Sequence, residues 1–121
     1  MKTSKDPRHV KRVKLMKTLF SWNFLQKKTP PKGISEIIKN LTLIDKTISD
    51  CAKDRPLSEI NKIDLSILRL AVFELIINIG VPPKVIVDEA VELGKEFGSD
   101  SSSSFINGVL GQVVKINNID I

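Results

Sequence analysis

Apolar residues recur along this chain at spacings of three and four, which is the period of an α-helix that buries one face. In the first segment Val13, Met16, Phe20 and Phe24 follow this spacing. Alternation of apolar and polar residues with a period of two, the pattern of a half-buried β-strand, is missing from the sequence. The sequence therefore predicts an all-α protein whose helices pack through apolar stripes.

Capping residues and helix breakers set the expected ends of these helices. Asp6 as N-cap and Pro7 at the first helical position start the first helix. Asn61 can cap a long apolar helix, and Gly80 and Gly98 are expected to end helices as C-cap residues. The expected helices cover residues 7–26, 35–53, a short turn at 57–60, 61–79, 82–97 and 101–115.

The first helix is expected to present two different faces. The apolar stripe forms its buried side. Arg8, Lys11 and Arg12 project to the opposite side, so this helix is predicted to be apolar on one face and basic on the other.

The length of 121 residues is typical of one domain, taken here as residues 1–121, and allows a hydrophobic core without cross-links. The single cysteine, Cys51, excludes an internal disulfide, and its isoleucine-rich surroundings indicate a buried packing residue in a reducing cytoplasm. No apolar run approaches the roughly 20 residues that a membrane helix needs. The basic N-terminus lacks the apolar core of a signal peptide. We therefore expect a cytoplasmic protein without membrane contact.

The net charge of +5 is distributed unevenly. Residues 1–28 contain nine Lys or Arg and one acidic residue, whereas residues 29–121 contain ten Lys or Arg and thirteen acidic residues. A basic segment concentrated at one end is typical of a surface that binds a polyanion. A solvated helix face is the alternative that charge alone leaves open.

Residues suited to catalysis are few. His9 is the only histidine, and within a basic helix start it is expected at the surface or against a phosphate. Glu89 and Glu92 lie three residues apart on one expected helix, but no Cys or His accompanies them, so we favour a solvated acidic face over a metal site. Phosphate-binding glycine loops, serine-nucleophile motifs and Cys-x-x-Cys are absent from the sequence. We expect no enzyme, no metal and no cofactor.

Three features favour RNA binding, and one of them is the N-terminus of the last helix, where backbone N–H groups near Ser101 to Phe105 suit an anionic oxygen. Phosphates can be neutralised by the basic face of the first helix, whose members are Lys5, Arg8, His9, Lys11 and Arg12, with Lys14 nearby. Phe105, in the first turn of the last helix, is either a core residue or an exposed ring on which an unpaired base could stack. A basic helix with an aromatic platform suits single-stranded RNA better than duplex DNA, because stacking needs unpaired bases.

Three ordered segments of the C-terminal half resemble the NusB family of transcription antitermination factors. They are residues 63–75 (IDLSILRLAVFEL), 81–99 (VPPKVIVDEAVELGKEFGS) and 105–111 (FINGVLG). The resemblance covers the whole chain and is strongest over residues 61–113. It implies a fold of two packed small helical bundles with a shortened N-terminal half.

The resemblance also implies a function. NusB proteins bind the boxA element of nascent ribosomal RNA together with NusE, a small-subunit ribosomal protein, within an RNA polymerase antitermination complex. Arg8, His9 and Arg12 match the family's arginine-rich RNA-binding start. Phe105 matches the aromatic residue with which the family contacts RNA.

Other positions carry over from the family in different roles. Phe20 and Asp64 match its NusE-facing surface, although a carboxylate in the first turn of a helix is also favoured by the helix dipole alone. Arg69 and Glu74 are expected to form a structural ion pair or a cap. Gly94 stands where the family usually has alanine, which costs about 1 kcal/mol of helix propensity unless packing requires the glycine.

Two alternatives from other classes stay open at the level of sequence. The chain could be a detached RNA-binding module like the N-terminal part of some rRNA cytosine methyltransferases. It could also be a helical protein that self-associates through apolar faces, and a homodimer is compatible with the family resemblance.

Overall fold

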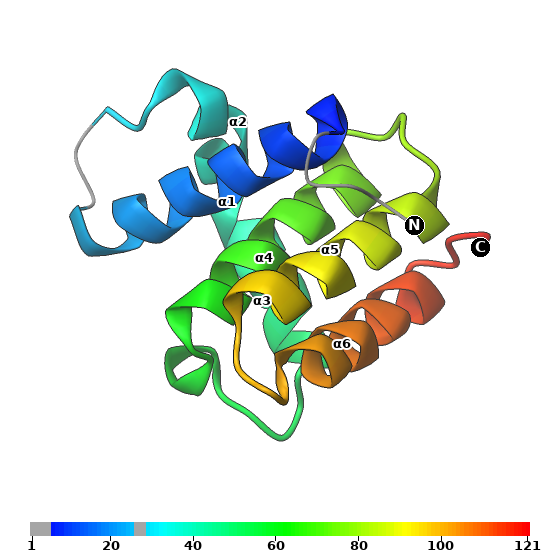
Figure 1. Cartoon of the computed structure of the whole chain (residues 1–121). Helices are drawn as coiled ribbons and strands as arrows, with labels where there is room; N and C mark the ends of the chain where they lie inside the picture. The colour runs from blue at the N-terminus through cyan, green and yellow to red at the C-terminus, as the bar shows by residue number, and fades with distance from the viewer. Residues whose placement is uncertain (1–5, 26–28) are drawn as a thin grey trace.

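The computed structural model describes residues 6–25 and 29–121, and these residues form helices without a β-strand (Figure 1). The predicted all-α class is confirmed. The elements are α1 (Pro7–Leu25), η1 (Lys32–Ile34), α2 (Ser35–Lys39), α3 (Leu41–Cys51), η2 (Leu57–Glu59), α4 (Lys62–Val72), the π-helical turn η3 (Phe73–Ile77), α5 (Pro83–Phe97) and α6 (Ser102–Ile116).

Helix α4 forms the centre of the molecule (Figure 1). Residues 64–72 are buried without interruption, as expected for a helix covered on every side. It packs against α1, α3, α5 and α6, and α5 and α6 lie side by side in opposite directions. Helix α1 with η1 and α2 forms the smaller N-terminal part, and α3 to α6 form the larger part. This arrangement agrees with the predicted packing of two small helical bundles.

Local capping signals place several helix ends where the sequence predicts them. The backbone N–H of Arg8 donates to Asp6 Oδ1 at 2.9 Å, and this hydrogen bond lowers the pKa of Asp6. Asn61 Oδ1 accepts the backbone N–H of Asp64 at 2.9 Å and so caps α4. Gly98 is the C-cap of α5. The two capping hydrogen bonds at Asp6 and Asn61 join residues only two or three positions apart, so they can be predicted from the local sequence.

Two predicted boundaries are wrong. The helix expected over residues 35–53 is divided at Asn40, whose side-chain Nδ2 donates to the carbonyl oxygen of Glu36 at 2.7 Å and competes with regular helical bonding. The long helix does not end at Gly80, because the π-helical turn η3 ends at Ile77 and Asn78 is its C-cap. Gly80 has no positive φ.

The buried stripe of α1 also differs from the apolar stripe predicted for it. The buried residues of α1 are His9, Arg12, Met16 and Leu19. Phe24 is 63% exposed, and Val13 and Phe20 are half-buried. The helix is therefore rotated relative to the prediction, because ion pairs hold its N-terminal half where an apolar pattern expects hydrophobic contacts.

Helices α5 and α6 approach closely at two glycines. A Cβ on Gly94 would lie 2.8 Å from Ile106 Cδ1 and 3.4 Å from the backbone of Ser103. An alanine at this position would therefore require the end of the buried Ile106 side chain to shift, which offsets part of the gain in helix propensity. Cys51 is buried as predicted, and burial raises the pKa of its thiol.

Replacing Gly98, the second of these glycines, should weaken the contact between α5 and α6. In Gly98→Ala the new Cβ would overlap the Ser102 side chain and lie 2.8 Å from the Gly94 carbonyl oxygen. We expect the free energy of unfolding to fall by about 1–3 kcal/mol in urea titrations. Gly111→Ala is the control, since nothing lies within 4 Å of its Cβ, and it should leave stability unchanged or raise it by up to about 1 kcal/mol. Equal effects of the two variants would contradict this account.

Candidate nucleic-acid interface

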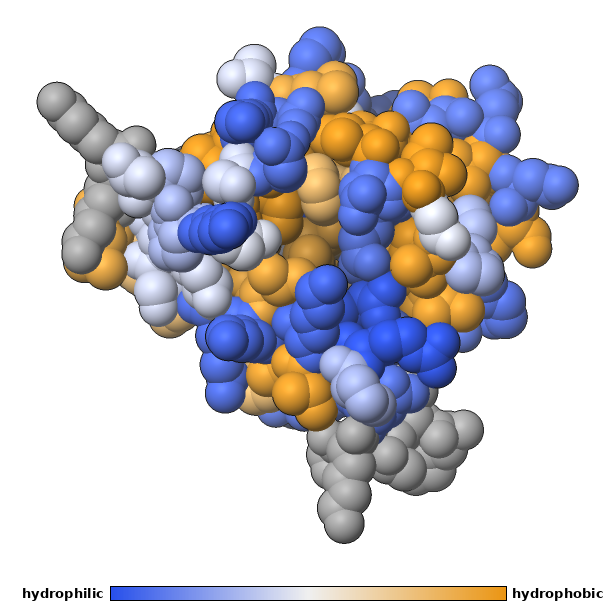
Figure 2. Space-filling model, turned by 90° about the horizontal axis from the view of Figure 1, so that it is seen from above, coloured by the Kyte–Doolittle hydropathy of each residue, from blue (hydrophilic) through white to orange (hydrophobic). Residues whose placement is uncertain are grey.

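The exposed side of α1 carries a row of cations. Arg8, Lys11, Lys14 and Lys17 are all exposed, and the Arg8 side chain keeps 82% of its surface. Arg8 lies 3.5 Å from Asp6, an exposed pair that contributes little to stability. On the face of the molecule seen from above, hydrophilic and hydrophobic residues are interspersed (Figure 2). This row can bind phosphates without disturbing the fold.

Two basic residues of α1 point into the protein instead. Arg12 donates from Nε and Nη2 to the two carboxylate oxygens of Glu74 at 3.0 and 2.8 Å, and from Nη1 to Glu89 at 3.4 Å. His9 contacts Glu96 through Nε2 at 2.6 Å and Glu89 through Nδ1 at 3.4 Å. Hydrogen bonding to Glu74 raises the pKa of Arg12 against the opposing effect of burial.

This buried ion network corrects three expectations. His9 and Arg12, predicted on the exposed basic face, are only 4% and 8% exposed. Glu89, predicted on a solvated acidic face, is 3% exposed. Charged residues stay buried when they are paired and hydrogen-bonded, as they are here. The helical spacing of His9 and Arg12 with the buried Met16 is the one sequence signal that could have indicated their direction.

The expectation that Arg69 and Glu74 serve structural ion pairs is confirmed, with partners that the sequence did not indicate. Arg69 donates to both oxygens of Asp45 at 2.9 and 3.0 Å and to Asn23 Oδ1 at 3.3 Å. Glu74 pairs with Arg12 rather than with Arg69. The two pairs tie α4 and η3 to α3 and α1.

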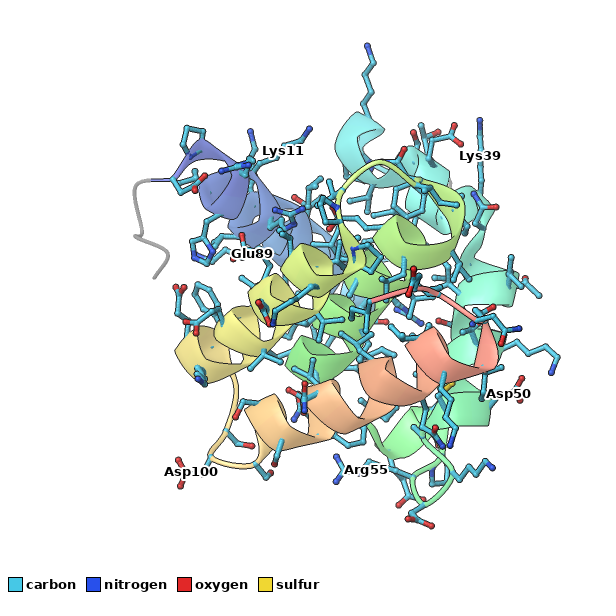
Figure 3. All side chains as sticks on the ribbon, turned by 90° about the vertical axis from the view of Figure 1, so that its right-hand side faces the viewer. Lys11, Lys39, Asp50, Arg55, Glu89 and Asp100 are labelled. Atoms are coloured by element: carbon cyan, nitrogen blue, oxygen red, sulfur yellow. The ribbon has the colours of Figure 1, made fainter. Side chains whose placement is uncertain are left out.

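Phe105 is half-buried and packs partly against the core. The guanidinium of Arg55 lies 4.0 Å from its ring centroid, a cation–π contact that covers one ring face. Lys11 and Arg55 are at opposite edges of the molecule in Figure 3. The structure therefore does not bring Phe105 beside the basic start of α1. Lys5, the other predicted contact, lies outside the described residues.

The predicted partner-facing residues have different surroundings. Phe20 is half-buried and meets the exposed ring of Phe24 edge to face, with centroids 5.0 Å apart. Asp64 is only 2% exposed, and its Oδ1 accepts no hydrogen bond from any described residue. An unpaired buried carboxylate oxygen is costly, so its lack of a partner within the described chain needs an explanation.

The described residues contain no group of three or more His, Cys, Asp or Glu side chains that could hold a metal ion. None of the described helices is long and apolar enough to cross a membrane. The fold and the cationic row on α1 define a small all-α domain that presents its charged groups on a helix surface.

Comparison with known proteins identifies the family. The NusB family model matches residues 26–115, and the chain belongs to this family. It is 46% identical over 83 residues to the transcription antitermination protein NusB of Acetivibrio thermocellus, covering 69% of this chain and 57% of the relative. It is 43% identical over 91 residues to that of Pseudothermotoga lettingae, covering 75% and 65%. The matched part thus spans less than two thirds of either relative.

Solved structures agree with this assignment. The structure of T. maritima NusB superposes with a TM-score of 0.81 at 30% identity, covering 95% of this chain and 93% of the other. A chain from the crystal structure of a plectonemic RNA supercoil gives a TM-score of 0.80 at 20% identity, covering 94% and 98%. The second likeness shows the fold alone. Helix α1 lies outside the matched segment of the family model but inside a fold shared with NusB.

Removing the arginine of the buried network should be costly. Arg12→Ala leaves Glu74 and Glu89, whose side chains are 13% and 4% exposed, without their main cationic partner. We expect the free energy of unfolding to fall by about 3–5 kcal/mol, measured by denaturant titration. Lys14→Ala, an exposed cation on the same helix, should change stability by less than about 0.5 kcal/mol. Similar losses in both variants would show that the network does not hold α1.

Proposed function

We propose that this protein is a transcription antitermination factor that binds boxA-type single-stranded RNA of the rRNA leader together with NusE, within an RNA polymerase antitermination complex in the cytoplasm. The single observation that carries the proposal is the exposed cationic row of α1 on a NusB fold. Relatives that match this chain are named transcription antitermination proteins, which supports the same role. The proposed action is binding, with no catalysis and no cofactor.

RNA contact is assigned first to the exposed cations. Arg8 and Lys11 are exposed and can bind phosphates, Arg8 in exchange for its 3.5 Å pair with Asp6, and Lys5 extends the same basic segment in the sequence. Direct phosphate contact by His9 and Arg12 stays a prediction, which the burial of both side chains disfavours. We propose instead that these two residues hold α1 in position. Phe105 stays a predicted stacking partner for an unpaired base, and Arg55, whose guanidinium lies 4.0 Å from the ring centroid, would have to share or leave the ring.

NusE is assigned to the surface around Phe20 and Asp64. The exposed ring of Phe24 extends the apolar part of this surface. Asp64 stays a predicted NusE contact that its 2% exposure disfavours, because a basic partner side chain could reach the buried Oδ1 only if the surrounding side chains moved. Binding RNA and NusE at once raises occupancy, because each partner raises the local concentration of the other. A homodimer through these exposed apolar side chains is the alternative.

RNA binding can be tested by the salt dependence of affinity. Fluorescence anisotropy of a labelled boxA RNA should show tighter binding than to a scrambled RNA, and tighter still with NusE. Arg8→Ala removes one phosphate contact, so the slope of log affinity against log salt should fall by about 0.7 for a single strand. Lys46→Ala, an exposed cation of α3, is the control and should keep the slope. Weak binding that ignores RNA sequence and NusE would exclude the proposed function.

The partner surface can be tested by an isosteric change. Asp64→Asn keeps the shape of a 2%-exposed side chain and removes its charge. Loss of a charged hydrogen bond is worth about 1.5–3 kcal/mol, so NusE binding should weaken roughly 10- to 100-fold in calorimetry. RNA binding without NusE should stay the same, as should both affinities in Asp50→Asn, an exposed control on α3. Unchanged NusE affinity would remove Asp64 from the partner surface.

A further inference from the structure

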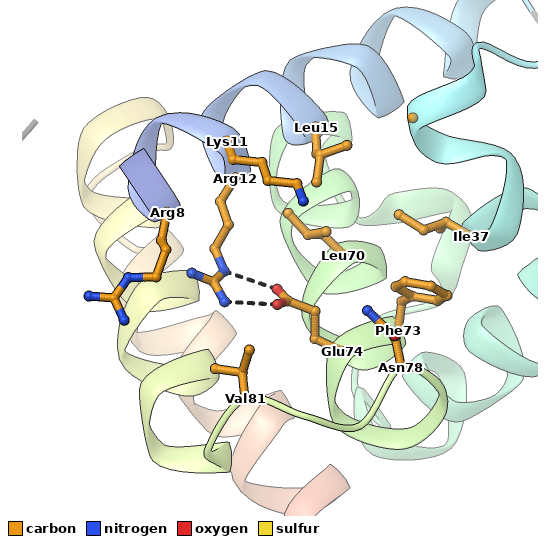
Figure 4. A pocket seen from close by; sticks show the side chains of 11 residues that line it. Arg8, Lys11, Arg12, Leu15, Ile37, Leu70, Phe73, Glu74, Asn78 and Val81 are labelled. Atoms are coloured by element: carbon orange, nitrogen blue, oxygen red, sulfur yellow. Dashed lines mark hydrogen bonds and ion pairs between the residues drawn. The ribbon is translucent and has the colours of Figure 1, made fainter. Parts of the chain in front are cut away.

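A pocket of about 430 Å³ opens beneath the basic start of α1 (Figure 4). Its apolar lining is Leu15, Ile37, Leu70, Phe73 and Val81. This volume is in the range of small-molecule sites and is sufficient for one base with its ribose. None of the sequence motifs and none of the family matches assigns a ligand to it.

Two cationic side chains, Arg8 and Lys11, lie at the opening of this pocket. Arg8 and Lys11 line it from α1 and are exposed, and Lys11 reaches over the apolar wall at Leu70 (Figure 4). Lys11 has no ion pair with another described residue, so its ammonium is available to a ligand. Arg12 and Glu74 also line the pocket but satisfy each other through two hydrogen bonds. The net charge of the lining therefore favours an anionic ligand.

The π-helical turn η3 supplies the other recognition groups. In an α-helix the nearest neighbours on one face are three or four residues apart, and residues five apart point to different sides. Here the backbone N–H of Asn78 donates to the carbonyl oxygen of Phe73 at 2.9 Å, five residues back, and both side chains line the pocket. Such turns are rare and are frequent at functional sites. The turn brings an aromatic ring and a carboxamide to one side of the pocket.

These groups match one chemical class. A flat ring can stack on Phe73, and a carboxamide such as that of Asn78 can donate to and accept from the edge of an adenine. Arg8 and Lys11 suit the phosphate attached to the same nucleoside. An aliphatic anchor of an acidic peptide would use the cations and the apolar wall but would leave the carboxamide unused.

We propose that this pocket binds one unpaired adenine nucleotide of the RNA strand, with the base stacked on Phe73, its edge on the carboxamide of Asn78 and its phosphate on Arg8 and Lys11. The inference rests on the proposed function, because the strand must follow α1 to reach the pocket. It adds a base-reading site to a helix otherwise expected to contact phosphates without sequence choice.

The pocket can be tested with 2-aminopurine, a fluorescent purine that is quenched on stacking but lacks the 6-amino group of adenine, and with adenosine monophosphate as the competitor that carries this group and should displace it. The full chain is titrated with 2-aminopurine riboside monophosphate and with a boxA RNA that carries 2-aminopurine at single unpaired positions. We expect saturable quenching with the mononucleotide and stronger binding at one position of the RNA. Inorganic phosphate should compete only weakly, which separates recognition of the base from recognition of the anion.

Variants separate the base contacts from the charge contacts. Phe73→Leu and Asn78→Ala should weaken binding on the order of tenfold and leave the salt slope unchanged, since neither group carries charge. Lys11→Ala should weaken binding and lower the slope. Ile79→Ala changes a side chain that is 79% exposed and lies outside the pocket, and this control variant should behave like the wild type. Thermal unfolding shows whether each variant is folded. If Phe73→Leu does not fold, Asn78→Ala still tests the base contact, because Asn78 is exposed and its replacement does not disturb the core.

Each failure has a separate meaning. RNA that binds with normal affinity to both base-contact variants, without quenching, would overturn the nucleotide pocket and leave RNA binding by α1 intact. The pocket would then suit an apolar side chain of an acidic peptide. RNA that does not bind at all would overturn the proposed function, and with it the assignment of an RNA strand to the pocket. Quenching by the mononucleotide but at no position of the RNA would also overturn the RNA assignment.

Discussion

The position of α1 depends on the contacts of two buried side chains, Arg12 and His9, with carboxylates of η3 and α5. Arg12 and His9 contact three carboxylates, of which Glu74 belongs to η3 and Glu89 and Glu96 belong to α5. Apolar contacts such as those of Met16 and Leu19 hold a helix against its neighbours but allow some rotation about its axis. The planar guanidinium with two parallel hydrogen bonds to Glu74 allows much less. Burying these charges is expensive, and what the protein gains is a defined orientation of α1.

That orientation determines the rest of the candidate surface. With Arg12 directed inward, Arg8 and Lys11 are directed outward on neighbouring turns, and the pocket opens between them and η3. Glu74 has two roles, since it anchors Arg12 and belongs to the π-helical turn that presents Phe73 and Asn78. The fold and the candidate site therefore share the same residues, and a change in the network would alter both.

Local signals in the sequence were sufficient for much of the fold. The caps at Asp6 and Asn61 involve neighbours two or three residues away, and the all-α class follows from the apolar period. The rotation of α1 was not predictable in this way, because Arg12 meets Glu74 and Glu89 across 62 and 77 residues. A hydrophobic pattern also treats every arginine as exposed.

The candidate site shows the same division between local and long-range information. Arg8 and Lys11 were predicted on an exposed face and lie there, whereas Arg55 against Phe105 and the π-helical turn had no signal in the pattern. Counting charged residues in the sequence also gives an incomplete estimate of the electrostatic potential at the protein surface. Pairing Arg12 with Glu74 and Glu89 removes one cation from solvent, but it also removes carboxylates that would repel a polyanion. The potential outside α1 then depends on the exposed row of cations and on acidic residues beside it that stay partly exposed, such as Glu96, whereas the buried residues neutralise one another.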